Sequence, residues 1–279
     1  MGVTRSSYSP IPAAGQRLAG RVAVVTGAST GIGAAVTHLF LELGASVVAM
    51  ARDEDRLARM ADGWPAERVS LVPGDVALES DVERLVATAL DRHDGLDIVV
   101  SNAGIHRTRP FLETGLDAWR EIMGINLDGS FLVCRTAARA MVEGGTPGSM
   151  VIVASTNSLV AEPVMAAYNA SKAALTSLTA SMAIELAPYD IRVIAVAPGT
   201  IATEITRPMI AAGHPFGGIP LGRIGDAREV AWAVAFLAGD EASYVTGAKL
   251  VVDGGQLAIN GEPLPYPAPG RLGGPPQRP

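Results

Sequence analysis

The chain has 279 residues, a formal net charge of −6 and 48% apolar residues, which suffices for the core of one large globular domain. The acidic balance argues against nucleic-acid binding, because proteins that bind a phosphate backbone cluster lysine and arginine. A single cysteine, Cys134, excludes a disulfide framework and fits a reducing compartment. Because Cys134 falls in an apolar helical run, we expect a buried and unreactive thiol.

Composition divides the chain into three expected segments: a loosely ordered arm (1–19), one domain (20–260) and a tail rich in proline and glycine (261–279). A frayed terminus is the simplest interpretation of the tail, with a polyproline ligand or a flap over a neighbouring subunit as alternatives. The first twenty residues lack the apolar stretch of a signal peptide, and no apolar run is long enough to span a bilayer. We therefore expect a cytoplasmic protein.

Short apolar runs alternate with segments of helical spacing. The runs predict strands over Arg21–Thr26, Ala45–Ala51, Arg68–Pro73, Leu96–Ser101, Ser149–Ser155, Ile191–Ala197 and Lys249–Val252. The spacing predicts helices over Ile32–Leu43, Glu54–Ala61, Ser80–Arg92, Leu116–Val142, Ala166–Ala187 and Ala227–Ala238. This alternation implies an α/β fold, a doubly wound parallel sheet of seven strands with helices on both faces. Such sheets bind ligands beyond the carboxyl ends of their strands.

The first predicted strand runs into a glycine-rich turn, Thr26–Gly33 (TGASTGIG). Glycine permits tight backbone angles and the close approach of a ligand. The helix that begins near Gly31 would offer unpaired N–H groups and the positive end of its dipole to a pyrophosphate. A glycine cluster between a strand and a helix therefore predicts dinucleotide binding, although its spacing differs from G-x-G-x-x-G.

Thr26–Gly33 resembles the TGxxxGIG signature of the short-chain dehydrogenase/reductase family, and further motifs follow in the family's order. They are Gly74-Asp75-Val76, Asn102-Ala103-Gly104, Pro198-Gly199 with Thr203, and Val252–Gly255. Ser101 stands where the family often has asparagine. The resemblance covers about Gly20–Ile259. It implies a Rossmann-type domain that transfers a hydride between NAD(P)(H) and an alcohol/carbonyl pair.

The resemblance also implies which residues bind the cofactor. Asp75 would contact the adenine, and the segment that starts at Pro198 would face the nicotinamide. The expected set is Gly27, Ser29, Thr30, Gly31, Ile32, Gly33, Arg52, Asp75, Val76, Asn102, Ala103, Gly104, Tyr168, Lys172, Pro198, Gly199, Ile201 and Thr203.

The end of the second strand bears on the choice between NAD and NADP. An acidic residue there would bind the ribose hydroxyls and repel a 2′-phosphate. Here the corresponding position is Ala51, followed by Arg52, whose guanidinium suits a phosphate. Ser29 could add a hydroxyl contact. We expect NADP(H) to be favoured over NAD(H); the alternative is that Arg52 is a solvated surface residue and Asp53 caps the next helix.

Tyr168 and Lys172 stand four residues apart on one face of a predicted helix. A free phenol has a pKa near ~10, and a nearby ammonium would favour the phenolate. We therefore expect Lys172 to lower the pKa of Tyr168 into a range useful for acid–base catalysis. Taken alone the pair would be unremarkable, but within the resemblance Tyr168 is the catalytic proton donor, and Lys172 also binds the nicotinamide ribose.

Ser155 closes the fifth predicted strand, thirteen residues before Tyr168, and matches the family's catalytic serine. Its hydroxyl would hold the substrate oxygen beside the Tyr168 hydroxyl, with Thr156 and Ser158 as alternatives. Asn126 lies inside a long predicted helix, and in the family this asparagine holds a water that links the lysine to solvent. The simpler interpretation of Asn126 is an exposed helix residue.

No cluster of His, Cys or Asp has the spacing of metal ligands, so no metal is expected. The four histidines, His38, His93, His106 and His214, are scattered. His106 follows the Asn102-Ala103-Gly104 motif closely enough to touch a substrate, although a solvated loop histidine is the simpler interpretation.

Two variable stretches should determine which substrate binds: Asn157–Met165 and Thr200–Gly222. The second is too long for a simple connection, as expected of a lid over the active site. Both are largely apolar and indicate a hydrophobic or amphiphilic carbonyl compound. Together with the expected NADP(H), this favours an NADPH-dependent carbonyl reductase that acts on a ketone or a 3-oxoacyl compound. Glu162, Glu204 and Arg207 could instead serve a polar substrate, as in an NAD-dependent sugar, polyol or secondary-alcohol dehydrogenase. Further alternatives are a related epimerase or dehydratase and a non-catalytic dinucleotide sensor. A sensor typically lacks the tyrosine or the lysine, whereas all four catalytic positions are filled here.

Family members usually form tetramers through the two long helices that follow strands four and five, so a homo-oligomer, tetramer or dimer, is expected. The apolar residues that could supply this contact are Trp119, Phe131, Met141, Leu175, Leu178 and Met182. The alternative is that they belong to the core of the single chain.

Overall fold

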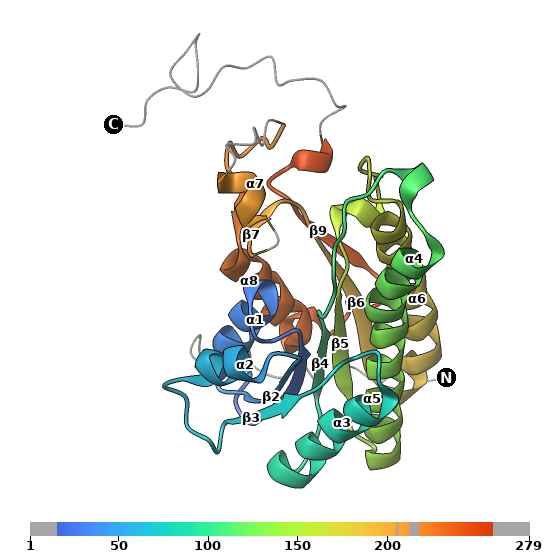
Figure 1. Ribbon diagram of the computed structural model, residues 1–279. Helices are drawn as coiled ribbons and strands as arrows, with labels where there is room; N and C mark the ends of the chain where they lie inside the picture. Colours follow the sequence, from blue (N-terminus) through green and yellow to red (C-terminus); the bar gives the residue numbers. More distant parts are fainter. Residues whose placement is uncertain (1–15, 205, 212–217, 259–279) are drawn as a thin grey trace.

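The structure is a computed structural model that describes residues 16–204, 206–211 and 218–258, and a parallel sheet forms its centre. The strand order is β3-β2-β1-β4-β5-β6-β9, so the chain starts in the middle of the sheet and winds toward both edges (Figure 1). The strands are β1 (Val22–Thr26), β2 (Ser46–Ala51), β3 (Val69–Pro73), β4 (Ile98–Ser101), β5 (Gly148–Val153), β6 (Ile191–Pro198) and β9 (Lys249–Val252). The expected seven-stranded, doubly wound fold is confirmed. Its strand order reverses between β1 and β4, where such sheets bind their ligands.

Helices cover both faces of the sheet (Figure 1). One face carries α1 (Gly31–Glu42), α2 (Glu54–Ala61) and α8 (Ala227–Ala238), and the other carries α3 (Glu79–His93), α5 (Gly129–Gly144) and α6 (Ala166–Leu186), with α4 (Leu116–Met123) beside α6. Successive residues of β1 enter different cores, because Ala23 and Val25 pack toward α1 while Val22 and Val24 pack toward α3. Both faces of the central strands are buried, which explains why these strands are apolar throughout.

The predicted helix Leu116–Val142 is interrupted. After α4 ends at Met123, a π-helical turn, η2, spans Gly124–Asp128, and α5 then continues from Gly129. Single π turns inside helices are frequent at functional sites, because the extra residue changes which side chains face inward. Here Asn126 is fully buried, so the interpretation of an exposed helix asparagine is wrong.

Several short elements were not predicted, because two to five residues carry too little periodicity for a pattern to detect. They are β7 (Ile201–Ala202), β8 (Gly225–Asp226), α7 (Arg207–Ala211) and the 3-10 turns η1 (Phe111–Glu113), η3 (Thr156–Ser158), η4 (Ala187–Tyr189), η5 (Asp240–Ala242) and η6 (Gln256–Ala258). β7 pairs with β8 in a separate small parallel sheet.

Two expectations about burial are corrected. β9 is the last strand of the sheet, and its residues alternate between exposed and partly buried rather than being covered on both faces. Met141 and Leu175 lie in the core of the single chain at 1% exposure, so they cannot supply a contact between subunits. Cys134 is fully buried as expected, and burial raises the pKa of its thiol to about 12.

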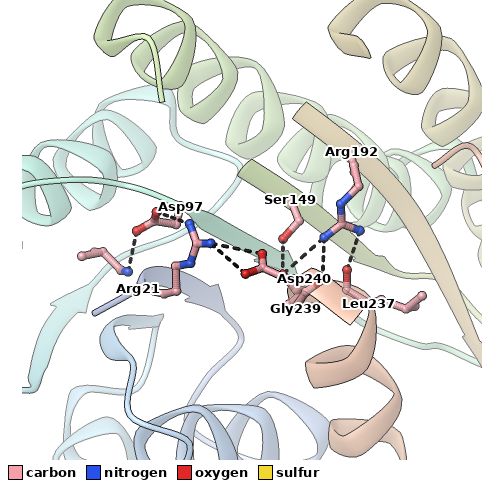
Figure 2. A network of polar contacts seen from close by, with 9 residues as sticks. Arg21, Asp97, Ser149, Arg192, Leu237, Gly239 and Asp240 are labelled. Carbon is pink, nitrogen blue, oxygen red and sulfur yellow. Dashed lines mark hydrogen bonds and ion pairs between the residues drawn. The ribbon is translucent and has the colours of Figure 1, made fainter. Parts of the chain in front are cut away.

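A polar network closes the sheet at the amino ends of its strands, opposite the ligand-binding edge (Figure 2). Arg21 donates hydrogen bonds of 3.1 Å to Asp97 and to Asp240, which ties the start of β1 to the segment before β4 and to η5. Arg192, near the start of β6, donates to the carbonyl oxygens of Leu237 at 2.8 Å and of Gly239 at 3.0 Å. These bonds satisfy carbonyls that the end of α8 leaves unpaired and place a cation at the negative end of its dipole.

Parts of three predicted segments lie outside the described residues: most of the N-terminal arm, the C-terminal tail, and part of Thr200–Gly222, including His214. Within the described part of the chain, no helix combines the length and apolar character needed to cross a membrane. Across the same residues, His, Cys, Asp and Glu side chains form no group of three that could hold a metal ion.

Candidate active site

The glycine turn connects β1 to α1 with a backbone that requires glycine. Gly27 has φ +63°, in the left-handed region that side chains rarely adopt. A Cβ added at Gly33 would lie 2.1 Å from the carbonyl oxygen of Gly27, so only glycine lets α1 start this close to the strand. Thr30, at the N-cap of α1, makes no side-chain hydrogen bond to the helix. The first N–H groups of α1 therefore have no side-chain acceptor and face the groove at the end of the sheet.

Hydrogen bonds hold the end of β4 against this turn. The Thr26 hydroxyl accepts from the backbone N–H groups of Asn102 and Ala103 at 3.0 and 3.1 Å. The Asn102 side chain donates in return to the carbonyl oxygens of Thr26 and Gly27 at 3.0 and 3.2 Å. The Asn102-Ala103-Gly104 motif thus fixes the shape of the glycine turn at the point where the strand order reverses.

A groove of about 270 Å³ runs along the carboxyl edge of the sheet between these segments. Of the expected cofactor residues, it is lined by Gly27, Ser29, Thr30, Gly31, Ile32, Arg52, Asp75, Val76, Asn102, Ala103, Gly104 and Thr203. Gly33 is buried beneath the turn and does not line the groove. Segments far apart in the sequence therefore meet in one groove at the carboxyl edge of the sheet, where doubly wound folds bind dinucleotides.

Charged side chains gather at the end of the groove near β2. The Arg52 side chain is 62% exposed, and its guanidinium lies 3.9 Å from the carboxylate of Asp75. Arg56, on α2, forms ion pairs with Asp53 at 3.1 Å and with Glu204 at 2.5 Å. Asp53 also caps α2, as the sequence suggested, by accepting from the backbone N–H of Arg56 at 2.9 Å.

A second cavity, of about 150 Å³, continues from the groove. Its lining includes Ser155, Tyr168 and Lys172, together with Pro198, Gly199, Ile201 and Thr203 of the expected cofactor set. Ile32, Asn102, Gly104 and Thr203 line both spaces, so the two join. The structure therefore brings three of the four predicted catalytic side chains to one end of the predicted cofactor groove, whereas Asn126 is buried and does not line this cavity.

Burial dominates the acidity of Tyr168 and Lys172. Burial raises the pKa of Tyr168, and interaction with the Ser155 hydroxyl only partly opposes this. Burial lowers the pKa of Lys172 to about 8. The expectation that the pKa of Tyr168 is lowered overall is thus wrong for the chain by itself, because desolvation has a larger effect than an ammonium nitrogen 5.7 Å from the centre of the phenol ring.

Lys172 and Asn126 are held in place by backbone groups. The Lys172 ammonium donates to the carbonyl oxygen of Val153 at 2.9 Å. The Asn126 amide accepts from the N–H of Ile105 at 2.8 Å and donates to the carbonyl of the same residue at 3.0 Å. A Cβ added at Gly104 would lie 3.2 Å from Asn126 Oδ1 and 3.6 Å from Lys172 Nζ, so these two polar atoms face the same space.

Comparison with known proteins agrees with this geometry. A family model described as enoyl-(acyl carrier protein) reductase matches residues 27–256. The chain belongs to the short-chain dehydrogenase/reductase family. This short-chain dehydrogenase/reductase is 38% identical to a protein named glucose 1-dehydrogenase from Gluconobacter oxydans (strain 621H), over 88% of this chain and 95% of the relative. It is 35% identical to a protein named NADP-dependent (R)-specific alcohol dehydrogenase from Lentilactobacillus kefiri, over 87% and 98%.

Solved structures show that the likeness to short-chain dehydrogenases/reductases extends over the fold as well as the sequence motifs. A short-chain type dehydrogenase/reductase from Mycobacterium marinum superposes with a TM-score of 0.82 at 37% identity, covering 87% of this chain and 97% of that one. The expected family and fold are confirmed. Like these relatives, the chain is an oxidoreductase that acts on CH–OH and C=O groups.

Other parts of this short-chain dehydrogenase/reductase site differ from expectation. Thr156 and Ser158, the alternatives to Ser155, do not line the cavity, and the Ser158 hydroxyl donates to the backbone carbonyl of Ser155 at 2.7 Å. His106 is partly buried rather than solvated, with its ring edge-to-face against Tyr168 at 5.5 Å. Burial lowers the pKa of His106, while the Glu162 carboxylate opposes that shift.

Sequence reasoning missed some residues of this short-chain dehydrogenase/reductase site. Met50, Ile105 and Ile125 also line the groove, as do Gly74 and Glu204, which the sequence analysis named without a role in cofactor binding. Positions directly before or after the recognised motifs could have indicated Met50 and Ile105, whereas Ile125 lies in the unpredicted π turn. Asn157 contacts Ser155 but was named only as the first residue of a substrate-determining stretch.

Proposed function

We propose that this protein is an NADP(H)-dependent oxidoreductase that works mainly as a reductase of ketones or 3-oxoacyl compounds. The observation that carries the cofactor preference is the exposed guanidinium of Arg52 at the groove's rim, directly after Ala51. Among the described residues that line the groove, Arg52 is the one basic side chain. A 2′-phosphate needs such a partner, because Asp75 and Glu204 would otherwise repel it.

The groove fits a dinucleotide on its own geometry. Close packing at Gly33 brings the start of α1 next to the glycine turn, and the N–H groups there, which no side chain at the N-cap accepts from, suit a pyrophosphate. The cavity that joins the groove leaves room for a nicotinamide beside Tyr168. In this proposal the cofactor residues are those of the expected set, with Gly33 acting through packing rather than contact. A bound nicotinamide would supply or accept the hydride.

We propose that Ser155 and Tyr168 bind the substrate oxygen together. Both hydroxyls can donate a hydrogen bond to a carbonyl oxygen, which orients the carbonyl carbon and stabilises the negative charge that develops on the oxygen. Tyr168 then gives up its proton to that oxygen during reduction and takes it back during oxidation. Ser155 is 8% exposed, so little water competes for its hydroxyl.

Lys172 and Asn126 serve this proton transfer in the proposal. A Lys172 ammonium stabilises the phenolate that remains after Tyr168 has given up its proton, and a positively charged nicotinamide would act in the same direction. The Asn126 amide oxygen faces the same space as the Lys172 ammonium, beside Gly104. We propose that Tyr168 regains its proton from solvent by way of Lys172 and a water held by Asn126.

A second candidate, a sugar or polyol dehydrogenase, is favoured by His106 and Glu162. His106 touches the Tyr168 ring, and the Glu162 carboxylate influences the pKa of both residues, so polar groups lie close to the reacting position. Such groups suit a substrate with hydroxyls beside its reacting carbon. The named relative glucose 1-dehydrogenase agrees with this second candidate.

A matched substrate panel tests both candidates. Purified enzyme is assayed with NADPH and NADH against ketones, 3-oxoacyl thioesters and cyclic ketones, and with NADP⁺ and NAD⁺ against aldoses, polyols and secondary alcohols. Our first proposal predicts the highest kcat/KM for an apolar carbonyl compound with NADPH. A preference for an aldose would favour the second candidate, and tight NADPH binding with no turnover on any compound would indicate a non-catalytic sensor.

Lys172 provides a prediction about stability and pH. Because the pKa of Lys172 falls from 10.5 to about 8 on burial, keeping its ammonium inside the folded chain costs about 3 kcal/mol below pH 8. Between pH 8 and 10.5 the unfolded chain binds more protons than the folded chain, so stability rises with pH in that window.

We therefore expect Lys172→Met to raise the free energy of unfolding at pH 7 by about 1–3 kcal/mol, after allowing for the lost hydrogen bond to Val153. This advantage should fade toward pH 10.5, as measured by urea denaturation at several pH values. Lys249→Met, at an exposed position on β9, is the control and should show no such trend. A Lys172→Met enzyme less stable than the wild type at pH 7 would contradict the prediction.

We also propose a homo-oligomer formed through α5 and α6. Phe131, Leu178, Met182 and Tyr189 line an apolar hollow between these two helices, and Phe131 is 42% exposed. Of the expected contact residues, Phe131, Leu178 and Met182 fit this role.

A further inference from the structure

A chain of side-chain amides leads away from the candidate catalytic serine. The Ser155 hydroxyl donates to Asn157 Oδ1 at 3.2 Å, and the backbone N–H of Asn157 donates back to the same hydroxyl oxygen at 3.1 Å. Asn157 Nδ2 donates to Asn169 Oδ1 at 2.8 Å, and Asn169 Nδ2 donates to the carbonyl oxygen of Glu162 at 2.9 Å. The two bonds between Ser155 and Asn157 are buried, and Asn157 is 7% exposed, so water does not easily replace these partners.

The end of this chain fixes the direction of every bond in it. A backbone carbonyl can only accept, so the Asn169 amide must turn its NH₂ group toward Glu162 and its oxygen toward Asn157. Asn157 must then turn its NH₂ group toward Asn169, which leaves its oxygen facing Ser155. The Glu162 carbonyl thereby fixes the orientation of both amides, so that the Ser155 hydroxyl faces an acceptor, the Oδ1 atom of Asn157.

We propose that Asn157 and Asn169 are positioning residues that keep the Ser155 hydroxyl proton on the Asn157 amide oxygen until a substrate oxygen arrives. The inference rests on the roles proposed above for Ser155 and Tyr168. Without this acceptor the Ser155 proton can be given fully to the oxygen of Tyr168, whose pKa the Ser155 hydroxyl already lowers to some extent. The amide chain therefore limits how far Ser155 stabilises the phenolate in the substrate-free enzyme, and it leaves the serine proton ready for the substrate.

The arrangement also couples three segments of the site. Ser155 follows β5, Asn169 lies in the first turn of α6 next to Tyr168, and Glu162 belongs to the variable loop between them. The charged or titratable groups around the phenol are His106 from the loop after β4, Glu162 from the loop before α6, and Lys172 from α6. Asn157→Ala leaves the charges of these three groups unchanged, so a shift in Tyr168 acidity in that variant would report on the Ser155 proton.

The test measures the pH dependence of kcat/KM for alcohol oxidation, whose acidic limb reports deprotonation of Tyr168. Asn157→Ala removes the acceptor and should lower the apparent pKa of this limb by about 0.5–1. Asn157→Asp offers a charged acceptor and should raise it. Asn169→Ala, which never touches Ser155, frees the Asn157 amide to turn and should shift the limb in the same direction as Asn157→Ala, by less.

Ser158→Ala is the matched control. It removes a hydrogen bond in the same loop, to the Ser155 backbone rather than to its hydroxyl, and should leave the limb unshifted. A merely structural role for the asparagines would instead lower kcat/KM at every pH. Circular dichroism checks that each variant is folded.

A second readout does not depend on turnover. In enzyme labelled with ¹³Cζ-tyrosine, the Tyr168 resonance, assigned by its loss in Tyr168→Phe, reports the hydrogen bonds of the phenol oxygen. It should move in Asn157→Ala and Asn169→Ala but not in Ser158→Ala. If the enzyme oxidises no alcohol, the proposed function fails, yet this spectrum still decides the inference. An unchanged Tyr168 resonance in both asparagine variants would overturn it.

Discussion

Replacing Tyr168 with phenylalanine is expected to lower kcat by about 10²–10⁴-fold, the usual contribution of a positioned acid–base group. The ring would still fill its space against His106 and beneath Lys172, so only the hydroxyl is lost. Cofactor affinity should change little, because the glycine turn and Arg52 lie at the other end of the groove. Steady-state kinetics and a fluorescence titration with NADPH measure the two quantities separately.

Tyr244→Phe is the matched control, since this tyrosine is fully exposed and lines neither the catalytic cavity nor the hollow between α5 and α6. It should leave kcat within about twofold of the wild type. Retention of more than a tenth of the activity by Tyr168→Phe would mean that another group supplies the proton, and His106, in contact with the ring, would be the first to examine. Loss of NADPH binding together with activity would indicate a structural role instead.

The architecture was predictable from the sequence because its strands are buried on both faces. Segments such as Val22–Thr26 and Ser46–Ala51 must be apolar at nearly every position, which separates them clearly from the amphipathic helices. The prediction failed where an element depends on tertiary context. The π turn at Gly124–Asp128 follows the same helical spacing as its neighbours, and β9, the last strand of the sheet, exposes the side chains on one of its two faces.

The candidate site was predictable to the extent that its residues belong to motifs. Ser155, Tyr168 and Lys172 were assigned from their resemblance to the family's motifs, and the fold brings them to one cavity because the carboxyl ends of parallel strands share an edge. The direction of the Tyr168 pKa shift was not predictable, because it depends on how deeply the phenol is buried. The bond from Asn157 to Asn169 was equally hidden, since it joins residues of a loop and a helix that only the fold brings together.

Arg52 should determine which cofactor the enzyme prefers. Its guanidinium is exposed and lies 3.9 Å from Asp75, a contact too long and too solvated to bind it firmly, so it can turn toward a phosphate. The neighbouring Arg56 is occupied by Asp53 and Glu204. A 2′-phosphate bound here would gain charge-assisted hydrogen bonds of about 1.5–3 kcal/mol each, whereas the hydroxyl of NADH gains much less.

Arg52→Ala is therefore expected to weaken NADPH binding by about 10–100-fold and NADH binding by less than about threefold. Removal of the guanidinium also leaves the carboxylate of Asp75 uncompensated, which adds to the repulsion of a phosphate. Isothermal titration with both cofactors measures the two affinities, and raised salt should reduce the wild-type preference for NADPH. Arg59→Ala, an exposed arginine on α2 that does not line the groove, is the control. Equal losses for the two cofactors in Arg52→Ala would show that this side chain supports the groove without recognising the phosphate, and the preference would then have to be assigned anew among Ser29, Thr30 and Arg56.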